Sequence, residues 1–355
     1  MPSFDIIKEV KPKKSFRVAN VMGRFDLQNE HIKEHFQGDI DLSRDWQIGV
    51  IFGHSGTGKT IISKELFNND YIYSFDYKAE TILDDIPQDK TVEEITKTFN
   101  SVGFSSPPSW LKSYSVLSNG EKMRVDLARA ILEDRKLIVF DEFTSVVDRN
   151  VAKIGSAAIA KAIRRTDKKF IAVSCHEDII DWLEPDWIFD TNNMTFDYTR
   201  GRLRRPKIKL EIYEQKGKWE LFRKYHYLNI SINNASRQFI AYCNDEPCGF
   251  CAVLHFPHPN AKNIKKCTRL VVLPDYQGIG IGFKLLNFVA ELFVRDKYKF
   301  VIVTSTPSLI TSFKQSKCWN LKRFGRLKHH TGVLRGDFNS TNRITTSWEY
   351  VNIKN

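Results

Sequence analysis

The sequence lacks any apolar run long enough to cross a lipid bilayer, which takes about 18 consecutive residues. Apolar stretches such as those at 270–273 and 300–303 are far shorter. It also lacks low-complexity tracts, and residues 1–14 carry charges without the apolar segment of a signal peptide. With 42% hydrophobic and 27% charged residues, the composition is that of a globular protein. We therefore expect a cytoplasmic protein with no membrane partner.

Cysteine is scarce, and one group of cysteines has the spacing of metal ligands. The segments around this group, 239–243 and 248–256, predict two strands of a hairpin joined by an Asn-Asp-Glu-Pro turn. Because buried cysteine is common in such strands, structural thiols are favoured and a zinc site is the alternative. The group and the histidines that follow it are Cys243, Cys248, Cys251, His255 and His258.

Acidic residues are outnumbered, with 42 Asp and Glu against 54 Lys and Arg, a net charge of +12. The positive charge is concentrated at 200–209 and at 322–335. Clustered positive charge binds the phosphate backbone of nucleic acids by counterion release, although a charge run can also be a solvated surface. Nucleic acid is therefore a plausible partner.

A chain of 355 residues is longer than one ordinary core and suggests two domains. The first half alternates apolar strands with helical patterns, which is typical of a parallel α/β sheet, and the second half has an α+β pattern. We place the boundary in the basic segment, giving domains 1–203 and 204–355. In the first half we expect strands at 47–52, 136–140, 170–174 and 194–198, and helices at 58–66, 120–133, 152–164 and 177–182. In the second half we expect strands at 208–213, 267–273 and 299–305 besides the hairpin, and helices at 219–225, after the glycine-rich turn to 294, and at 306–313.

A phosphate-binding loop follows the strand at 47–52. The stretch Gly53-His-Ser-Gly-Thr-Gly-Lys-Thr60 fits the pattern G-x-x-x-x-G-K-[ST] between an apolar strand and a helix, which is the context that supports the motif. The glycines let backbone N–H groups face a β-phosphate, and the helix N-terminus adds partial positive charge. The predicted ATP-binding residues of this loop are Gly53, Ser55, Gly56, Thr57, Gly58, Lys59 and Thr60.

Two carboxylates end another apolar strand, Leu137 to Phe140, and complete the predicted ATP site. Lys59 is expected to bridge the β- and γ-phosphates, while Asp141 and the Thr60 hydroxyl hold Mg²⁺. Glu142 is the candidate general base for the attacking water. We therefore predict Thr60 and Asp141 as metal ligands and Glu142 as catalytic.

Three more segments resemble elements of ABC-type ATPases. Leu117-Ser-Asn-Gly-Glu121 resembles the signature motif, Thr144 to Asp148 resembles the D-loop, and Ser174-Cys-His176 resembles the end of the strand that carries the H-loop histidine. With the phosphate loop and the two carboxylates, all elements stand in ABC order within residues 16–200. The resemblance implies ATP hydrolysis with His176 as a catalytic residue and with Ser118, Gly120 and Asp148 contacting ATP.

In that family the signature residues contact the γ-phosphate bound by the opposite subunit. The resemblance therefore implies a head-to-tail homodimer, with Ser118 and Gly120 acting in trans. Asn119 stands where the family usually has Gly, and Glu121 where it has Gln. Segment 61–116 is shorter than the helical arm of transporter ATPases, and no clear Q-loop glutamine is present, Gln88 being a poor candidate. Because the arm and the Q-loop dock onto transmembrane partners, this argues against transport.

A second glycine-rich turn resembles motif A of the GNAT N-acetyltransferase superfamily. It consists of an apolar strand, a proline, and Gln277-Gly-Ile-Gly-Ile-Gly282 opening a helix. Glycine amides at a helix start can hold a diphosphate, and the resemblance implies that of acetyl-CoA, with the strand pairing with the pantetheine arm. The predicted cofactor-binding residues are Leu270, Val271, Val272, Gln277, Gly278, Ile279, Gly280, Ile281, Gly282 and Phe283.

The acid and base of this second domain are less evident. Phe313 stands where the family often carries a tyrosine that donates a proton, which phenylalanine cannot do. The strand at 267–272 also lacks the carboxylate often used as base. The remaining candidates, each with packing or surface roles as the commoner explanation, are His226, Tyr227, His255 and His258.

The whole chain resembles phage and bacterial proteins in which an ABC-type ATPase is fused to a GNAT-like domain. One hypothesis is an ATP-driven dimer that transfers an acyl group to nucleic acid or protein. Another is an ATPase that clamps nucleic acid, with the second domain as a binding module. A variant rests on His226-Tyr227 and on Lys328-His-His-Thr-Gly332, short matches to Mom-type DNA-modifying relatives of GNAT.

Overall fold

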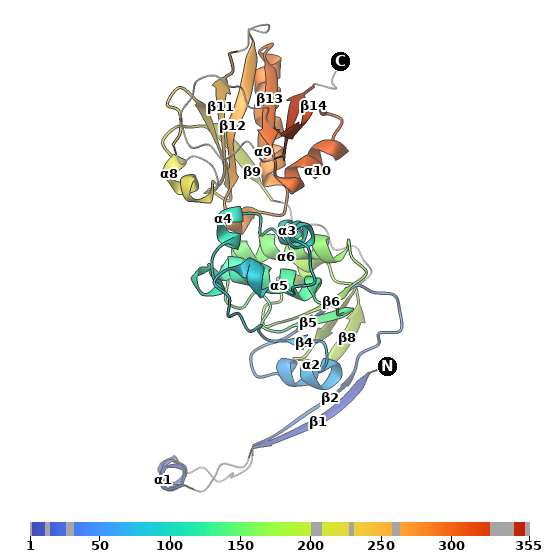
Figure 1. The fold of residues 1–355 in the computed structure, drawn as a ribbon. Helices are drawn as coiled ribbons and strands as arrows, with labels where there is room; N and C mark the ends of the chain where they lie inside the picture. Colours follow the sequence, from blue (N-terminus) through green and yellow to red (C-terminus); the bar gives the residue numbers. More distant parts are fainter. Residues whose placement is uncertain are drawn as a thin grey trace. The chain divides into compact units, whose positions relative to one another are not determined.

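The structure, a computed structural model, describes residues 2–10, 15–25, 32–199, 208–226, 231–257, 263–326 and 344–351. It forms two compact units (Figure 1). Unit 1 comprises residues 1–75, 134–146 and 163–205, and unit 2 comprises 76–133, 147–162 and 206–355. Within the described ranges, every helix is too short or too polar to pass through a bilayer. The predicted boundary at 203–204 lies outside the described residues and stays a prediction.

Unit 1 is built on a mainly parallel sheet whose described strands run in the order β4-β5-β6-β3-β7-β8. Only the last pair, β7 with β8, is antiparallel. Isoleucine, valine and phenylalanine fill the central strands, which are buried on both faces, as parallel strands usually are. The strands are β3 (Ile48–Phe52), β4 (Tyr71–Ile72), β5 (Leu137–Phe140), β6 (Lys169–Ser174), β7 (Trp187–Asp190) and β8 (Thr195–Tyr198).

Two helices of this unit follow strands of the sheet, α2 (Lys59–Phe67) after β3 and α7 (Ile179–Leu183) after β6. An antiparallel hairpin of β1 (Ser3–Val10) and β2 (Ile32–Asp39) adds Phe4 and Phe36 to the core. Helix α1 (Phe16–Arg24) lies between the two hairpin strands in sequence and has no buried residue. The hairpin and α1 were not predicted.

The helical part of unit 2 is held together by an apolar core centred on Phe99, Phe104 and Val125. Helices α3 and α5 each begin with a capping box, Thr91 with Glu94 and Ser118 with Glu121, which satisfies amides at the helix start. The elements are η1 (Ile82–Asp85), α3 (Val92–Ser101), α4 (Pro107–Trp110), η2 (Tyr114–Val116), α5 (Asn119–Leu132) and α6 (Arg149–Ile163), the last ending in unit 1.

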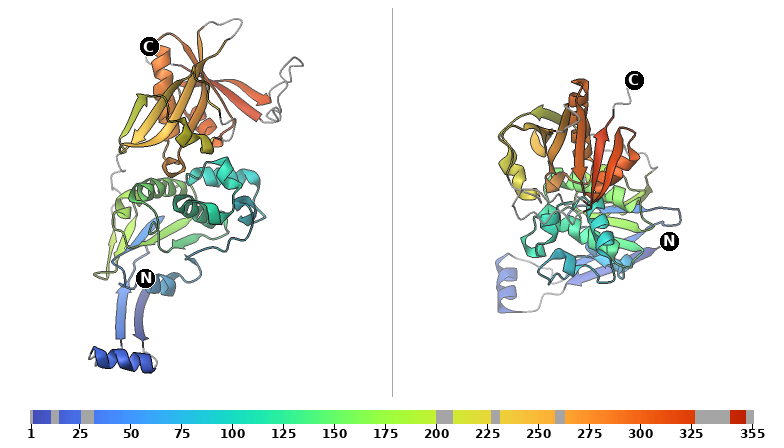
Figure 2. Two further views of the ribbon diagram at one scale, coloured as in Figure 1. Left: turned by 90° about the vertical axis from the view of Figure 1, so that its left-hand side faces the viewer. Right: turned by 45° about the horizontal axis from the view of Figure 1, so that its top comes forward.

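The rest of unit 2 contains a sheet whose described strands run in the order β14-β15-β13-β12-β11-β10-β9. Its pairings are antiparallel except for β12 with β13, and Figure 2 shows this sheet from two further sides. The strands are β9 (Leu210–Glu214), β10 (Arg237–Cys243), β11 (Glu246–His255), β12 (Ile264–Val272), β13 (Lys299–Thr304), β14 (Trp319–Arg326) and β15 (Ile344–Tyr350). The helices are α8 (Trp219–Phe222), η3 (Arg223–Tyr225), η4 (Pro274–Tyr276), α9 (Ile281–Arg295) and α10 (Pro307–Gln315).

The two faces of this sheet bury different side chains because neighbouring residues of a strand point to opposite sides. In β10, Phe239 and Ala241 join a core that includes residues of α9, whereas Ile240 joins Trp219 and Phe222 of α8. Helix α9 thus lies against one face and α8 against the other.

Most predicted elements are confirmed with shifted ends, including the hairpin at 237–256 and the strands at 136–140 and 299–305. Strands β4, β7, β14 and β15 and helices α3 and α4 were missed. Most of the two basic segments cannot be placed, since 200–207 and 327–335 lie outside the described residues.

A partly buried carboxyl in the helical part of unit 2 generates a pH prediction. Asp126 of α5 accepts hydrogen bonds from the hydroxyls of Tyr77 and Tyr114, at 2.7 and 2.8 Å, whose rings stack on each other. Burial raises the pKa of Asp126 to about 6, against the opposing effect of these two hydrogen bonds.

Because the pKa of Asp126 is higher in the folded state, its proton leaves the unfolded chain first as pH rises. The free energy of unfolding should therefore fall between about pH 4 and pH 6, by on the order of 2–3 kcal/mol, and be flat above that window. Asp126→Asn removes this contribution, so the variant should gain stability relative to wild type across the window in urea unfolding. Parallel stability curves for the two proteins would contradict the assignment.

Candidate functional site

The phosphate loop connects β3 to α2 at the carboxyl end of a central parallel strand, where ligands of such sheets bind. Gly56 and Gly58 have φ of 88° and 84°, which residues with a side chain rarely adopt. Gly58 is the N-cap of α2 and offers no capping side chain. The first helical bond runs from Ile62 N to Gly58 O, at 2.9 Å, so the three preceding amides have no acceptor within the helix.

Side chains of the phosphate loop itself and of the residues after β7 hold the loop in position. The Thr57 hydroxyl donates to His54 O at 2.9 Å and lies 2.6 Å from the Thr191 hydroxyl. Lys59 Nζ donates to His54 O at 2.6 Å, and His54 N donates to Asn192 Oδ1 at 2.8 Å. The predicted lysine therefore lies over the loop whose amides it is expected to assist.

The predicted metal ligands lie together. Asp141 is buried at the end of β5, and its Oδ2 accepts a hydrogen bond from the Thr60 hydroxyl at 2.8 Å. A carboxylate beside a hydroxyl at the start of the helix supplies the hard oxygen ligands that suit Mg²⁺. The next residue, Glu142, is exposed, has φ of 52°, and donates its N–H to Asp141 Oδ1 at 2.9 Å.

A tyrosine also contacts the predicted metal ligand. Tyr71 of β4 donates its hydroxyl hydrogen bond to the same Oδ2 of Asp141. Burial, followed by the effect of Asp141, raises the pKa of Tyr71 well above its usual value, so this hydroxyl stays protonated and donates. Asp141 is thus held by two hydroxyls from two different elements.

The remaining predicted ATP-site residues divide between the units. His176 follows β6 in unit 1, and its N–H bonds the Ser174 hydroxyl at 3.1 Å. Ser118 and Gly120 lie at the start of α5 in unit 2, and Asp148 precedes α6 in the same unit.

The capping box explains one departure from the usual signature sequence. Glu121 Oε2 accepts from Ser118 N and from the Ser118 hydroxyl, at 3.0 and 3.1 Å, while its Oε1 accepts from the Ser109 hydroxyl at 2.8 Å. A carboxylate at this position therefore fixes both the start of α5 and the segment before it. Its place near a helix N-terminus is also electrostatically favourable.

The predicted coenzyme loop occupies an equivalent place in the second sheet. Strand β12 pairs with β13 only from Ile264 to Cys267, so the described part of β12 beyond Cys267 pairs with β11 alone. The edge of β12 facing β13 therefore diverges over residues 268–272, which include the predicted Leu270, Val271 and Val272. Such an edge offers backbone N–H and C=O groups to an extended ligand.

Helix α9 begins as α2 does. Its N-cap is Gly280, with φ of 90° and no capping side chain, and the first helical bond is Lys284 N to Gly280 O at 3.1 Å. A methyl group added at Gly280 would meet no atom within 4 Å, so the space in front of the helix is open. The amides of Ile281, Gly282 and Phe283 have no acceptor within the helix. An anion of the size of a diphosphate fits this donor set.

The side chain of Gln277 is engaged by protein groups. Its Nε2 donates to Val272 O at 2.8 Å and its Oε1 accepts from Ser105 N at 2.6 Å. Gly278, with φ of 89°, follows it, and Ile279 packs against the α9 core. Gln277, Gly278 and Ile279 therefore hold the loop against the protein, while Gly280 borders the open space before α9.

The candidate acid–base residues have different surroundings. Phe313 is fully buried against Phe283, Trp319 and Trp348, which makes it part of the core. His226 lies edge-on to the Trp219 ring, and His255 is exposed at the end of β11. Tyr227, His258 and the segment 328–332 lie outside the described residues.

The hairpin cysteines are core residues. Cys243, Cys248 and Cys251 are buried, and burial raises the pKa of Cys248 to about 12. The Cys251 sulfur lies 3.7 Å from that of Cys267 on the neighbouring strand. In the described part of the chain, no three His, Cys, Asp or Glu side chains are grouped so as to hold a metal ion. The hairpin therefore contributes thiols to the apolar core.

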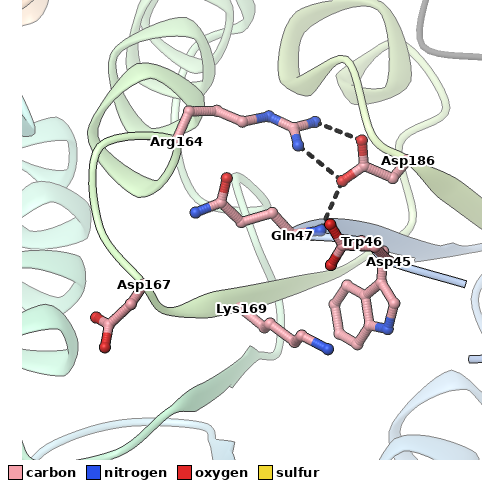
Figure 3. Close-up of a pocket in the computed structure, with 7 residues that line it drawn as sticks. All are labelled: Asp45, Trp46, Gln47, Arg164, Asp167, Lys169 and Asp186. Atoms are coloured by element: carbon pink, nitrogen blue, oxygen red, sulfur yellow. Dashed lines mark hydrogen bonds and ion pairs between the residues drawn. The ribbon is translucent and has the colours of Figure 1, made fainter.

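A polar hollow of about 340 Å³ lies in unit 1 at the amino ends of β3, β6 and β7 (Figure 3). Arg164 binds both carboxylate oxygens of Asp186, at 2.7 and 2.9 Å, and Asp186 also accepts the N–H groups of Gln47 and Ile48. Although burial acts in the opposite direction, Arg164 and these amides hold the pKa of Asp186 below its usual value. The hollow is lined by groups that brace the strand ends.

Several residues of both sites were not predicted. Tyr71, Thr191 and Asn192 contact the phosphate loop or its carboxylate, and Ser105 contacts the coenzyme loop. None belongs to a motif, and their contacts join residues far apart in sequence. Arg124 of α5 also donates hydrogen bonds to the carbonyls of Pro274 and Asp275, just before the coenzyme loop. Its position gives the one usable signal, because it is a charged residue at four-residue spacing between the small buried residues Gly120 and Ala128.

Comparisons with known proteins match both halves. The ABC transporter family model matches residues 63–145, and the acetyltransferase (GNAT) domain model matches residues 234–315. The ABC-type transporter MDR1 of Aureobasidium melanogenum is 34% identical over 89 residues, which cover 25% of this chain and 6% of that protein. The ABC multidrug transporter mdr1 of Aspergillus fumigatus is 35% identical over 92 residues, covering 26% and 7%. The chain therefore spans a small part of these relatives.

Solved structures of both kinds are also similar. The ribosomal-protein-S18-alanine N-acetyltransferase of Escherichia coli has a TM-score of 0.31 at 12% identity, covering 40% of this chain and 93% of that chain. A bacterial Atm1-family ABC exporter with ATP bound has a TM-score of 0.35 at 17% identity, covering 50% and 35%. A Bacillus subtilis acetyltransferase in complex with CoA has a TM-score of 0.30 at 13% identity, covering 41% and 100%. At these scores, the assignment rests on the family models and on the motifs.

Tyr71 generates a prediction for the ATP site. Tyr71→Phe removes one of the two hydroxyl donors that orient Asp141, so kcat/KM for ATP hydrolysis should fall about three- to tenfold, with a raised Mg²⁺ requirement. Tyr73→Phe is the matched control, because Tyr73 lies two residues on and is 65% exposed. Equal activities of the two variants would remove Tyr71 from the site.

Proposed function

We propose that this chain, which combines an ABC ATPase domain with a GNAT acetyltransferase domain, hydrolyses ATP at the loop 53–60 and binds acetyl-CoA at the loop 277–283, from which an acyl group passes to an acceptor. The same observation supports the proposal at the loop 53–60 and at the loop 277–283. Helices α2 and α9 each begin at a glycine with positive φ, at the end of the glycine-containing segment that follows a strand, and so present unpaired amides to a phosphate group.

At the ATP site, the proposal gives each residue a separate task. The amides of the loop and Lys59 bind the β- and γ-phosphates, and Thr60 with Asp141 holds Mg²⁺. When bound, Mg²⁺ neutralises charge on the phosphate oxygens. Glu142, exposed at the strand end, accepts a proton from the attacking water, and His176 stabilises the γ-phosphate side.

The opposite side of the γ-phosphate is proposed to come from a second copy of the chain. Ser118 stands at the N-terminus of α5, which favours an anion, Gly120 is buried in the first turn of that helix beside the Asp275 carboxylate, and Asp148 precedes α6. A head-to-tail homodimer would bring these residues to the partner's ATP.

At the coenzyme site, the diverging edge of β12 is proposed to pair with the pantetheine arm. An amine of the acceptor would attack the thioester carbon, the C–S bond would break, and the proton lost by the amine would reach the leaving thiolate. Since Phe313 is buried and has no proton to donate, this transfer uses water or a histidine such as His226 or His255. The net charge of +12 favours a polyanionic acceptor or a nucleic-acid partner.

A second candidate function follows from the buried Phe313 and from β12, which carries no carboxylate. In this alternative the GNAT domain binds coenzyme or nucleic acid without transferring an acyl group, and the ATPase clamps nucleic acid. Acyl transfer from labelled acetyl-CoA supports the first function. ATP hydrolysis stimulated by DNA or RNA without any transfer supports the second.

The ATP site is tested by two substitutions. Lys59→Ala should abolish ATP binding, because the cation over the loop is lost. Glu142→Gln keeps the shape of the site without its base, so it should bind MgATP, lose at least about 100-fold in kcat, and accumulate as a dimer in size-exclusion chromatography. Glu65→Gln, the same chemical change at an exposed position of α2, should leave both properties unchanged. A Glu142→Gln protein that stays monomeric in saturating MgATP rules out the dimer arrangement.

The coenzyme site is tested by Gly280→Glu. The new carboxylate would fill the open space before α9 and repel a diphosphate, so acetyl-CoA binding should be lost in calorimetry while ATP hydrolysis continues. Gly217→Glu is the control, because Gly217 also has positive φ and open space around it. Unchanged acetyl-CoA affinity in Gly280→Glu would refute the assignment of this loop.

A further inference from the structure

A fully buried arginine joins the signature helix to the segment before the coenzyme loop, both within unit 2. Arg124 lies in the second turn of α5 and has no exposed surface. Its Nη1 donates to the carbonyl of Pro274, and its Nη2 donates to that of Asp275 at 2.8 Å. Hydrogen bonds from a charged donor are stronger than neutral ones, and a buried guanidinium is costly unless it is paired. These carbonyls therefore fix Arg124, and Arg124 fixes η4.

The charges around this arginine are balanced locally. Burial lowers the pKa of Arg124 to about 10, opposed by the nearby carboxylates of Asp275 and Glu121, so the guanidinium keeps its charge at neutral pH. Asp275 also lies close to Gly120 in the first turn of α5. A methyl group added at Gly120 would lie 2.7 Å from Asp275 Oδ1. The small residue at this position is what admits the η4 segment.

A second pair of segments meets backbone to backbone. A methyl group at Gly103 would lie 2.7 Å from Gln277 O, and one at Gly278 would lie 2.9 Å from Gly103 Cα. Both glycines have positive φ, 85° and 89°. Beside them, the Ser105 N–H is the donor that holds the Gln277 side chain. Residues that precede α5 in the ATPase sequence thus contact the coenzyme loop and hold it in position.

We infer that the coenzyme site extends into the ATPase fold, with Arg124 as a positioning residue that fixes the coenzyme loop from the signature helix. This inference rests on the proposed function, since it requires that the loop 277–283 takes acetyl-CoA. Arg124 touches neither ligand. It acts through the carbonyls of Pro274 and Asp275, whose position sets the direction of the amides of residues 281–283, six to nine residues further on.

Arg124 also connects the proposed coenzyme site to the proposed nucleotide site through helix α5. Arg124 is one helical turn from Gly120, the residue proposed to meet the γ-phosphate of a partner subunit. A movement of α5 on nucleotide binding would therefore be transmitted to η4 and to the start of α9. If bound nucleotide changes the affinity for acetyl-CoA by a given factor, bound acetyl-CoA must change the affinity for nucleotide by the same factor.

The test is calorimetric titration of the 355-residue chain with acetyl-CoA. Arg124→Met keeps the apolar bulk and loses both donors, so the Kd should rise about tenfold or more. Arg124→Lys keeps a charged donor and should restore part of the affinity, which a purely space-filling role would not produce. Gly103→Ala places a methyl group against Gln277 and leaves Arg124 in place, so it should also weaken acetyl-CoA binding. If Arg124→Met does not fold, Gly103→Ala serves as the test variant.

Two matched controls separate positioning from general destabilisation. Arg129→Met removes another arginine of α5 that donates to a carbonyl, that of Asp76, away from the coenzyme loop. Gly217→Ala imposes the same backbone strain as Gly103→Ala, with φ of 88° and open space around it. Both controls should bind acetyl-CoA within twofold of wild type.

The outcomes are distinguishable. If wild type binds acetyl-CoA and both Arg124→Met and Gly103→Ala bind within twofold of it, the positioning role is wrong while the proposed function stands. If the two controls weaken binding as much as the two test variants, the role of Arg124 is only structural and the inference is overturned. If wild type binds no acetyl-CoA, the proposed coenzyme function itself fails and the inference fails with it.

Discussion

Backbone amides at the start of a helix, left without a partner, are the feature on which both proposed ligand sites depend. A helix leaves its first N–H groups unbonded, and most helices cover one of them with a capping serine, threonine, aspartate or asparagine. Helices α3 and α5 of this chain are capped in that way, whereas α2 and α9 begin at Gly58 and Gly280 and are not. The uncapped amides are donors that a phosphate can satisfy.

The amino-acid sequence predicts these two helix starts well because their determinants are local. A strand, a glycine-rich turn and a helix follow one another within about twenty residues, and the conformations of Gly58 and Gly280 depend on the lack of a Cβ atom. The same reasoning placed Asp141 and Thr60 in one site, and the structure brings them within hydrogen-bond distance.

The rest of the site was not predictable, because its contacts join distant segments. Tyr71 reaches Asp141 only because β4 and β5 are neighbours in the sheet, and Arg124 reaches η4 across 150 residues of sequence. Strands β14 and β15 were missed for a related reason. Strand β15 pairs on both sides, with β13 and β14, and neither pairing follows from a short turn.

These contacts indicate a role for the helical part of unit 2 that differs from the role of the arm in transporter ATPases. In transporter ATPases the corresponding arm docks on membrane partners, as the resemblance implied, and here the segment 61–116 is short. In this chain residues 76–133 belong to the same compact unit as the sheet β14-β15-β13-β12-β11-β10-β9, with Gly103, Ser105 and Arg124 in contact with the predicted coenzyme loop or the η4 segment before it. Glu121 fits this account, since it orders both the start of α5 and the segment carrying Ser109.

The central claim is that two glycine-capped helix starts bind two different phosphate-bearing ligands. Hydrogen–deuterium exchange of the first-turn amides, 59–61 in α2 and 281–283 in α9, tests it most directly. The account predicts that MgATP slows exchange at 59–61 and that acetyl-CoA slows exchange at 281–283. Saturating ligands that leave both first turns exchanging as in the free protein would contradict it.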